Sequence, residues 1–171
     1  MATSSKKTDV PFTCTFKLNK QPSSALACPG LGNFAAFSGR DAGRNNPDAV
    51  GKEGTGPLPP GTYYIVDRTS GGHLGWLYDV VRSRIYGTDR SRWFALYRND
   101  DVIDDETFVN GVKRGGFRLH PIGPLRLSEG CITLTDVAQF DRLRDALLQR
   151  TQFAIPGSKL TAYGTVEVIV P

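Results

Sequence analysis

The chain has 171 residues, 39% of them hydrophobic and 22% charged, and a formal net charge of +4. This length suffices for one domain with a sizeable core, and the composition excludes a chain that is disordered throughout. The basic residues are scattered, and there is no Lys/Arg block, recognition-helix pattern or long apolar stretch, so neither a nucleic-acid partner nor a membrane span is expected.

The first part of the chain predicts a flexible tail followed by β-strands. Residues 1–11 are polar and charged and lack the apolar segment of an ordinary secretory signal, so the folded domain is expected to span residues 12–171. Apolar and polar side chains alternate strictly over residues 12–18, which predicts a half-buried strand. Two further strands are expected near residues 23–28 and 33–38.

The middle of the chain alternates turns with short elements. Residues 39–56 are rich in Gly, Asn, Asp and Pro and predict a long surface loop. A Pro-Gly turn ahead of β-branched and aromatic residues predicts a strand over residues 62–67. Apolar residues spaced by three and four predict a short helix near residues 74–82. A strand is expected at residues 93–98, and Asn110 followed by glycine predicts a hairpin turn.

The hydrophobic period changes to that of a helix after residue 134. Thr135 or Asp136 can cap a helix that ends near Arg150. Residues 162–170 then predict a closing strand, so the fold class is mainly β, a single domain with one long helix near its end. The apolar stripe of the helix is expected to contain Val137, Phe140, Leu143, Leu147 and either Ala146 or Leu148.

The three cysteines permit one pair and one residue left over. A hairpin centred near Gln21 would place Cys14 opposite Cys28, so a disulfide between them can form in an oxidising compartment. The favoured interpretation is nevertheless two buried thiols that act as small apolar residues. Under both interpretations Cys131 is the unpaired cysteine.

His120 and Cys131 are the residues that point to chemistry. A thiol becomes a strong nucleophile only when it ionises, and an adjacent imidazole can accept its proton. A strand ending at His120 and a return strand starting at Cys131 would bring the two together at one end of a sheet, with a depressed pKa of the thiol. Gly130 removes a side chain beside the nucleophile, and backbone N–H groups of residues 128–131, with Ser128 in support, can face a developing oxyanion.

Structural roles for the same residues stay open. A cysteine after glycine is often a small buried residue, His120 can end a strand before Pro121, and Ser128 can make a local turn bond. His73 lies in a turn-like surface setting, and the carboxylates of residues 100–106 form a solvated run. No cluster has the spacing of metal ligands and no glycine-rich loop precedes a helix, so neither a metal nor another cofactor is expected.

The order of His120 and then Ser-Glu-Gly-Cys at residues 128–131 resembles the catalytic domain of YkuD-type L,D-transpeptidases, a β-sandwich or barrel with a cysteine nucleophile. Leu-Pro-Pro-Gly-Thr-Tyr-Tyr-Ile at residues 58–65 is similar to the strand entry of that family. More closely, residues 12–170 resemble the small type VI secretion effectors with L,D-transpeptidase-like domains, the Tlde1 type. Segments that carry this closer resemblance are Cys-Pro-Gly at 28–30, Ala-Phe-Ser-Gly at 36–39, Ile-Asp-Asp-Glu at 103–106, Phe-Arg-Leu-His-Pro at 117–121 and Ser-Glu-Gly-Cys-Ile-Thr-Leu at 128–134.

This resemblance implies acyl transfer on peptidoglycan stem peptides. Cys131 would attack the carbonyl of meso-diaminopimelate in a tetrapeptide stem and release D-Ala, with His120 moving the proton. Water would complete a carboxypeptidase cycle, a D-amino acid an exchange, and a second stem a cross-link. The resemblance also implies a cognate immunity protein, a secretion-system partner, synthesis in the cytoplasm without a signal peptide, and action in the periplasm of a target bacterium. Arg118 is a candidate for binding a stem carboxylate, with packing as the alternative.

Two positions depart from the wider family, and two rival functions remain. Glu129 stands where the family has histidine and is expected to be a spectator, and Thr133 lies where a basic residue is usual. Papain-like and NlpC/P60 enzymes place cysteine before histidine, the reverse of the order here. The rival from another class is a non-catalytic cell-wall or partner-binding module that holds glycan or protein with aromatic and basic residues.

Overall fold

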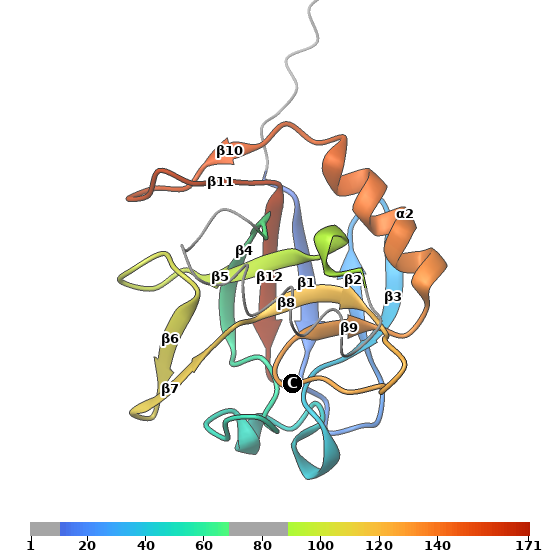
Figure 1. The fold of residues 1–171 in the computed structure, drawn as a ribbon, viewed down its shortest axis with the longest axis vertical. Coiled ribbons are helices and arrows are strands. Elements are labelled where there is room, and N and C mark those ends of the chain that lie inside the picture. The colour runs from blue at the N-terminus through green and yellow to red at the C-terminus, as the bar shows by residue number, and fades with distance from the viewer. Residues whose placement is uncertain (1–10, 69–88) are drawn as a thin grey trace, which may run out of the picture.

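The expected strands close into a barrel in the computed structural model, which describes residues 11–68 and 89–171. Each of the eight strands is hydrogen-bonded to the next, and the last pairs with the first (Figure 1). The fold is therefore mainly β, as predicted. In order around the wall the strands are β1 (Thr13–Lys17), β12 (Gly164–Ile169), β4 (Gly61–Asp67), β5 (Phe94–Arg98), β8 (Arg118–Pro121), β9 (Ile132–Leu134), β3 (Gly32–Phe37) and β2 (Ser24–Cys28).

Two small hairpins lie outside the barrel wall. The hairpin predicted at Asn110 consists of β6 (Glu106–Val109) and β7 (Val112–Gly115), and it extends away from the barrel in Figure 1. The second consists of β10 (Phe153–Ala154) and β11 (Thr161–Ala162). The single closing strand predicted over residues 162–170 is thus divided, because the chain changes partners: Ala162 pairs with Phe153, whereas Gly164 pairs with Ile65.

The helices of the described residues are three short 3-10 helices and one long α-helix. The expected loop at residues 39–56 contains two 3-10 helices, η1 (Asp41–Gly43) and η2 (Pro47–Ala49), and a third, η3 (Arg90–Arg92), precedes β5. The long helix is α2 (Val137–Leu148). The short helix expected near residues 74–82 lies outside the described residues, as do residues 1–10 of the expected N-terminal tail.

The first strand confirms the burial that its alternation predicts. Phe12, Cys14, Phe16 and Leu18 are all buried in the main core, while the residues between them are half-buried or exposed. Full burial of each large apolar side chain stabilises the fold by about 1.5–3 kcal/mol. This strand pairs with β2 on one side and, in parallel, with β12 on the other, so it joins the two ends of the described chain.

The long helix covers one side of the barrel, next to β3 in Figure 1. Its N-cap is Asp136, whose Oδ1 accepts a hydrogen bond from the backbone N–H of Gln139 at 3.1 Å. Phe140, Leu143 and Leu147 of the expected stripe are buried. Val137 is 49% exposed, so its assignment to the stripe was wrong, because the helix contacts the core only from its second turn onward.

A disulfide joins Cys14 and Cys28, which corrects the favoured interpretation of two buried thiols. The antiparallel register of β1 and β2 pairs Thr15 with Ala27 and Phe16 with Leu26, and its next pair is Cys14 with Cys28. Both cysteines are buried and their Cα atoms are 4.3 Å apart. The hairpin therefore brings the two sulfur atoms together on the inner face of the barrel.

We expect this disulfide to contribute measurably to stability. Its sequence separation of 14 residues corresponds to about 3 kcal/mol in the loop-entropy account. In a domain of this size the double variant Cys14→Ala/Cys28→Ala should melt about 6–12 °C lower than the oxidised wild type. Differential scanning calorimetry with and without dithiothreitol provides the matched control, because reductant should lower the melting temperature of the wild type but not that of the variant. Equal melting temperatures for oxidised and reduced wild type would contradict this expectation.

Candidate active site

Two neighbouring parallel strands carry the two residues singled out for chemistry. The register of β8 and β9 pairs Leu119 with Ile132 and His120 with Thr133. Cys131 immediately precedes β9, so it lies diagonally across the strand pair from His120. The ordinary spacing of strands and rise per residue place their Cα atoms about 8 Å apart. No hydrogen bond joins these two described side chains directly, since Sγ of Cys131 contacts the carbonyl oxygen of Gly116 and Nε2 of His120 contacts the hydroxyl of Thr133. The structure thus brings His120 and Cys131 to one edge of the same strand pair.

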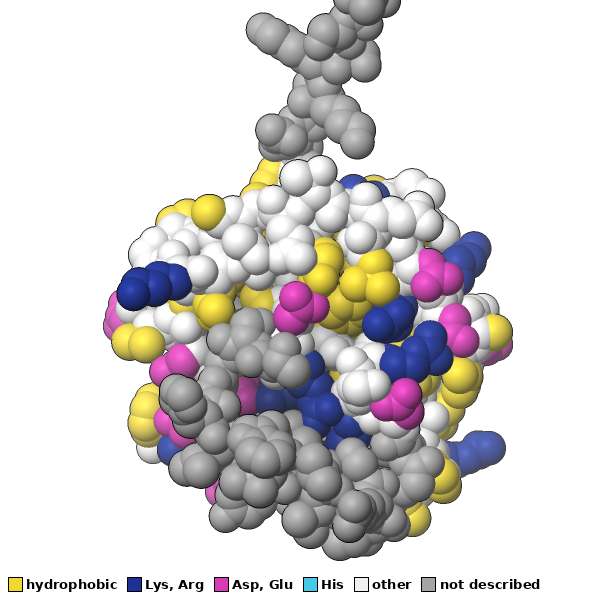
Figure 2. Space-filling model, turned by 45° about the horizontal axis from the view of Figure 1, so that its top comes forward, with side chains coloured by type: hydrophobic (Ala, Val, Ile, Leu, Met, Phe, Trp, Pro, Cys, Tyr) yellow, Lys and Arg dark blue, Asp and Glu magenta, His cyan; other side chains and the backbone are white. Residues whose placement is uncertain are grey.

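Both side chains open onto a cavity of about 320 Å³. Its described wall is mixed, with glycines and a proline beside charged and aromatic side chains. Lys and Arg side chains gather near the middle of the face shown in Figure 2, and three arginines belong to the cavity wall. The charged, aromatic and other polar or thiol side chains of this wall are Arg68, Arg90, Trp93, Arg118, His120, Ser128, Glu129 and Cys131.

The imidazole of His120 is fixed on three sides. Its ring stacks on the indole of Trp93, with centroids 4.2 Å apart and planes inclined by 19°. Nδ1 lies 2.7 Å from the carbonyl oxygen of Pro121, and Nε2 lies 3.2 Å from the hydroxyl oxygen of Thr133. A carbonyl only accepts hydrogen bonds, so Nδ1 carries the hydrogen and Nε2 presents its lone pair. Nε2 is therefore the atom that can take a proton.

His120 is neutral at physiological pH. It is only 6% exposed, and this burial lowers its pKa to about 4, although the hydrogen bond with Pro121 opposes the shift. The positive charges of Arg90 and Arg118 lower the pKa further. A neutral imidazole is the form that acts as a general base. The side chain is consequently ready to accept a proton over the whole neutral range.

Cys131 is the free cysteine of the chain, and it is half-buried in the cavity wall. Its Sγ lies 3.9 Å from the carbonyl oxygen of Gly116, to which the thiol donates a weak hydrogen bond. Burial raises the pKa of the thiol, while the charge and backbone of Arg118 act in the opposite direction. The expected depressed pKa is therefore wrong. The resting pair is a neutral thiol and a neutral imidazole, and the thiolate must form as the reaction begins.

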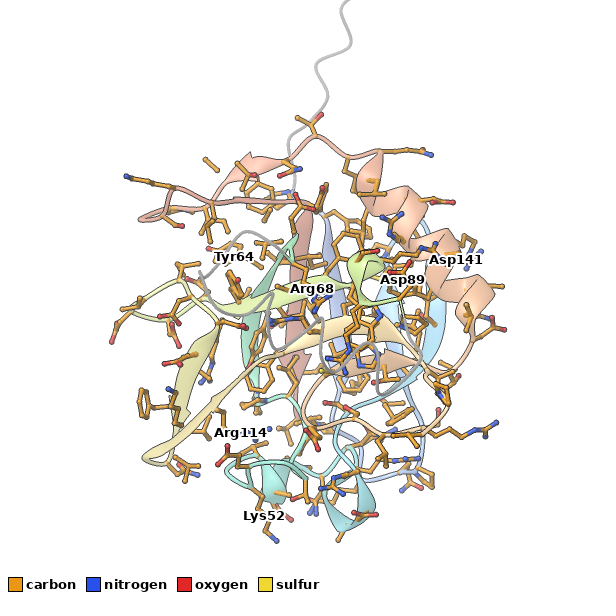
Figure 3. The ribbon with its side chains drawn as sticks, viewed as in Figure 1. Lys52, Tyr64, Arg68, Asp89, Arg114 and Asp141 are labelled. Carbon is orange, nitrogen blue, oxygen red and sulfur yellow. A yellow bond between two sulfur atoms is a disulfide. The ribbon has the colours of Figure 1, made fainter. Side chains whose placement is uncertain are left out.

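The residue before the cysteine has to be glycine. Gly130 has φ of +112°, a conformation that side chains disfavour. A Cβ atom there would lie 2.7 Å from Nη2 of Arg114 and 2.9 Å from a ring carbon of Phe117. Arg114, labelled in Figure 3, is itself held in place by the loop of residues 39–56 and its continuation. Its guanidinium donates to the carbonyl oxygens of Val50, Gly56 and Pro57.

Ser128 and Glu129, the two residues ahead of Gly130, have different roles. The hydroxyl of Ser128 donates to the carbonyl oxygen of Cys131 at 2.7 Å and accepts the backbone N–H of Gly39 at 3.2 Å. Glu129 is exposed and forms a long ion pair of 4.0 Å with Arg40 at the rim. Ser128 thus fixes the turn, whereas Glu129 acts on the cysteine only through its negative charge, which raises the pKa of the thiol.

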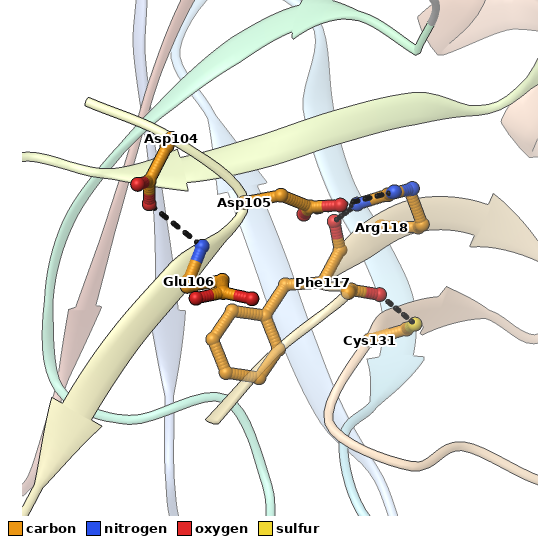
Figure 4. Close-up of polar contacts among 7 residues, drawn as sticks. Asp104, Asp105, Glu106, Phe117, Arg118 and Cys131 are labelled. Atoms are coloured by element: carbon orange, nitrogen blue, oxygen red, sulfur yellow. Dashed lines mark hydrogen bonds and ion pairs between the residues drawn. The ribbon is translucent and has the colours of Figure 1, made fainter. Parts of the chain in front are cut away.

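The guanidinium of Arg118 forms an ion pair with a carboxylate of the same chain. Its two terminal nitrogens lie 2.6 and 2.7 Å from the two carboxylate oxygens of Asp105 (Figure 4). The expected solvated run of carboxylates is therefore wrong at Asp105. The guanidinium of Arg118, expected as a candidate for binding a stem carboxylate, is already occupied by Asp105. This supports the alternative of an internal role for Arg118.

The described residues offer no site for a metal, since no group of three or more His, Cys, Asp or Glu side chains gathers among residues 11–68 and 89–171. In the same ranges, none of the helices is both long and apolar enough to cross a membrane.

Four residues of the site escaped sequence reasoning. Trp93 stacks on His120, Asp105 binds Arg118, and Arg114 lies behind Gly130, and each of these contacts depends on the tertiary fold. Thr133 was noted as a departure from a family pattern, but its contact with the imidazole was not foreseen. Only the position of Thr133 could have been predicted from the sequence. It lies two residues after Cys131, and residues i and i+2 of a strand lie on the same face.

Comparison with known proteins gives one match. A family model described as the Tlde1 domain matches residues 32–158, about three quarters of the chain. No curated protein and no solved structure matches the chain. The matched range contains every residue of the described cavity wall.

Proposed function

The chain belongs to the Tlde1 domain family of type VI secretion effectors, and from this premise we propose that it is a cysteine acyltransferase acting on peptidoglycan stem peptides. The observation that carries the proposal is the cavity onto which the free thiol of Cys131 and the neutral imidazole of His120 both open. Acyl transfer needs a nucleophile and a base beside one carbonyl carbon. A cavity of about 320 Å³ suits the end of a stem peptide.

In the proposed reaction, Sγ of Cys131 attacks the carbonyl carbon at the L-centre of meso-diaminopimelate. Nε2 of His120 takes the thiol proton as the sulfur–carbon bond forms, and then gives it to the nitrogen of D-Ala as the carbon–nitrogen bond breaks. The products of this half-reaction are free D-Ala and a thioester on Cys131. Water then releases a tripeptide stem, while a D-amino acid or the amine of a second stem gives exchange or a cross-link.

The residues around the pair have supporting roles in this proposal. The oxyanion of the tetrahedral intermediate is assigned to backbone N–H groups of the turn that ends at Cys131. Gly130 leaves this turn without a side chain, and the hydrogen bonds of Ser128 hold its shape. Thr133 can donate to Nε2 when the imidazole is neutral and accept from it when protonated, so its hydroxyl fits both states of the base.

The disulfide supports action in an oxidising compartment. Disulfides persist in the bacterial periplasm and are rare in the cytosol, and the pair Cys14–Cys28 is built into the barrel wall. We therefore propose the periplasm of a target bacterium as the place of action. The family also leads us to propose a secretion-system partner that exports the protein and an immunity protein that protects the producer.

The test is direct conversion of defined substrate. Purified tetrapeptide stems incubated with the oxidised protein should become tripeptides with release of D-Ala, or tetrapeptides with an exchanged last residue when a D-amino acid is added. Mass spectrometry of the stems separates these products. Unchanged stems, with a protein shown to be folded, would sink the proposal and favour a non-catalytic module that merely binds cell-wall material.

A further inference from the structure

The strongest unassigned feature is the ion pair between Arg118 and Asp105 beside the cysteine. Asp105 comes from the segment before β6, and Arg118 is the first residue of β8. The arginine side chain is 13% exposed and the aspartate 28% exposed, so water screens this pair only partly. Nη1 of Arg118 also donates to the carbonyl oxygen of Phe117 at 2.8 Å. The guanidinium is thus held by three hydrogen bonds.

The strand register places Arg118 opposite Cys131. Leu119 pairs with Ile132 across β8 and β9, so the preceding pair along the two chains is Arg118 and Cys131. Both residues also belong to the wall of the same cavity. Figure 4 shows the guanidinium of Arg118 against Asp105, with Cys131 nearby, just before the start of β9.

We propose that Arg118, held by Asp105, is a positioning residue that stabilises the thiolate of Cys131 as it forms. This inference rests on the proposed function for its meaning in turnover. A half-buried thiolate is less hydrated than one in water, and a fixed positive charge in a partly dry cavity compensates for the missing hydration. An arginine clamped by a bidentate carboxylate supplies the charge without having to reorganise.

Other charges also face the thiol of Cys131, and they determine the direction in which each variant should shift its pKa. Two carboxylates oppose the thiolate, those of Glu129 and Asp105, while Arg118 supports it. Arg114 lies behind Gly130, and two further arginines line the cavity. Burial opposes the charge on Arg118, but the hydrogen bonds and charge of Asp105 raise the pKa of the guanidinium, so it stays protonated. The full set of charged or titratable groups around the thiol is Arg68, Arg90, Asp105, Arg114, Arg118, His120 and Glu129.

The experiment measures the rate of iodoacetamide alkylation of the native, oxidised protein between pH 6 and 11, because burial already raises the pKa of the thiol. Only Cys131 can react, since Cys14 and Cys28 are joined. Arg118→Met should move the midpoint of the profile to higher pH and slow alkylation at pH 7 about three- to tenfold. Asp105→Asn removes a negative charge, yet its amide oxygen and Phe117 can still hold Arg118, so the midpoint should move to lower pH. Arg118→Lys, which keeps the charge, should stay close to the wild type.

A purely structural ion pair predicts a different pattern. Breaking it from either side would change alkylation in the same direction or not at all. Shifts of the same sign for Arg118→Met and Asp105→Asn, or an unchanged midpoint for Arg118→Met, would therefore overturn the proposal. Should Arg118→Met fail to fold, Arg118→Gln, which removes the charge but keeps a hydrogen-bond donor for Asp105, takes its place, and a midpoint that is unchanged or lowered counts against the proposal.

A matched charge control comes from the same loop as the cysteine. Glu129→Gln removes a carboxylate that faces the thiol without touching the clamp, and it should shift the midpoint to lower pH as Asp105→Asn does. Alkylation requires no stem peptide. The two proposals can therefore fail separately. If the midpoints of Arg118→Met and Asp105→Asn shift in opposite directions but the protein leaves stems unchanged, the proposed function is contradicted and the role of Arg118 stands. If the protein converts stems but the midpoints do not shift in opposite directions, the role of Arg118 is contradicted and the proposed function stands.

Discussion

Replacing Cys131 with alanine should lower the rate at which tetrapeptide stems lose D-Ala by about three orders of magnitude or more. The thioester cannot form without Sγ, and no second thiol can take its place because Cys14 and Cys28 form the disulfide. The side chain is small and its one hydrogen bond is weak, so the alanine variant should keep the fold. Initial rates from mass spectrometry of the stems give the measurement.

The disulfide variant supplies the matched control for this loss. Cys14→Ala/Cys28→Ala removes two of the three cysteines of the chain but leaves Cys131, so it should retain activity well below its melting temperature. If Cys131→Ala kept a tenth or more of the wild-type rate, the cysteine would not be the nucleophile, and the cavity would need another explanation.

Replacing His120 with asparagine should slow the same reaction by about 10²–10⁴-fold. Asparagine can still donate to the carbonyl oxygen of Pro121, but it cannot take the thiol proton. Because burial raises the pKa of Cys131, the remaining activity should increase with pH as the thiolate forms without help. The wild type should instead lose activity on the acid side only near the pKa of His120, about 4.

Two results would count against this role for His120. One is a pH profile of kcat/KM that is the same in the variant and the wild type. The other is a wild-type rate that falls already between pH 7 and 6, as it would with an imidazole of ordinary pKa.

Unfolding of the protein at low pH has to be distinguished from the expected loss of wild-type activity near pH 4. The pKa of His120 is lowered from 6.5 to about 4 in the folded protein. Between these two values the unfolded chain binds a proton that the folded chain does not, so the free energy of unfolding decreases as the pH falls through this window. The contribution lost is about 3 kcal/mol at most. Rates near pH 4 therefore have to be divided by the folded fraction, which is measured at each pH.

Patterns of residues close together in the sequence were sufficient to predict most of the strands and the long helix. Strict alternation predicted the burial of Phe12, Phe16 and Leu18, and the Asn-Gly dipeptide predicted the hairpin at Asn110. The capping residue Asp136 and the spacing after it predicted α2. These features succeeded because a helix cap, a two-residue turn and a strand face are each decided by residues close together in the sequence.

The contacts that complete the site depend on how the barrel closes. Trp93 reaches His120 across β5 and β8, and Asp105 reaches Arg118 from a loop 13 residues away. Neither partner is marked by spacing or composition, and Asp105 lies among acidic residues that resemble a solvated run. The disulfide depended on the register of one hairpin, which the sequence allowed but did not require. The pKa of Cys131 went the opposite way from expectation because burial, which no short motif encodes, outweighs the nearby positive charge.

The most direct measurement of the central claim is the mass of the protein during turnover. Tetrapeptide stems are mixed with the oxidised protein, the reaction is stopped with acid within the first turnovers, and the intact protein and its peptides are analysed by mass spectrometry. The account predicts a thioester adduct with the mass of the acyl part of the stem, located on Cys131 and absent from Cys131→Ala. Stem cleavage with no adduct on Cys131, or with the adduct on another residue, would contradict it.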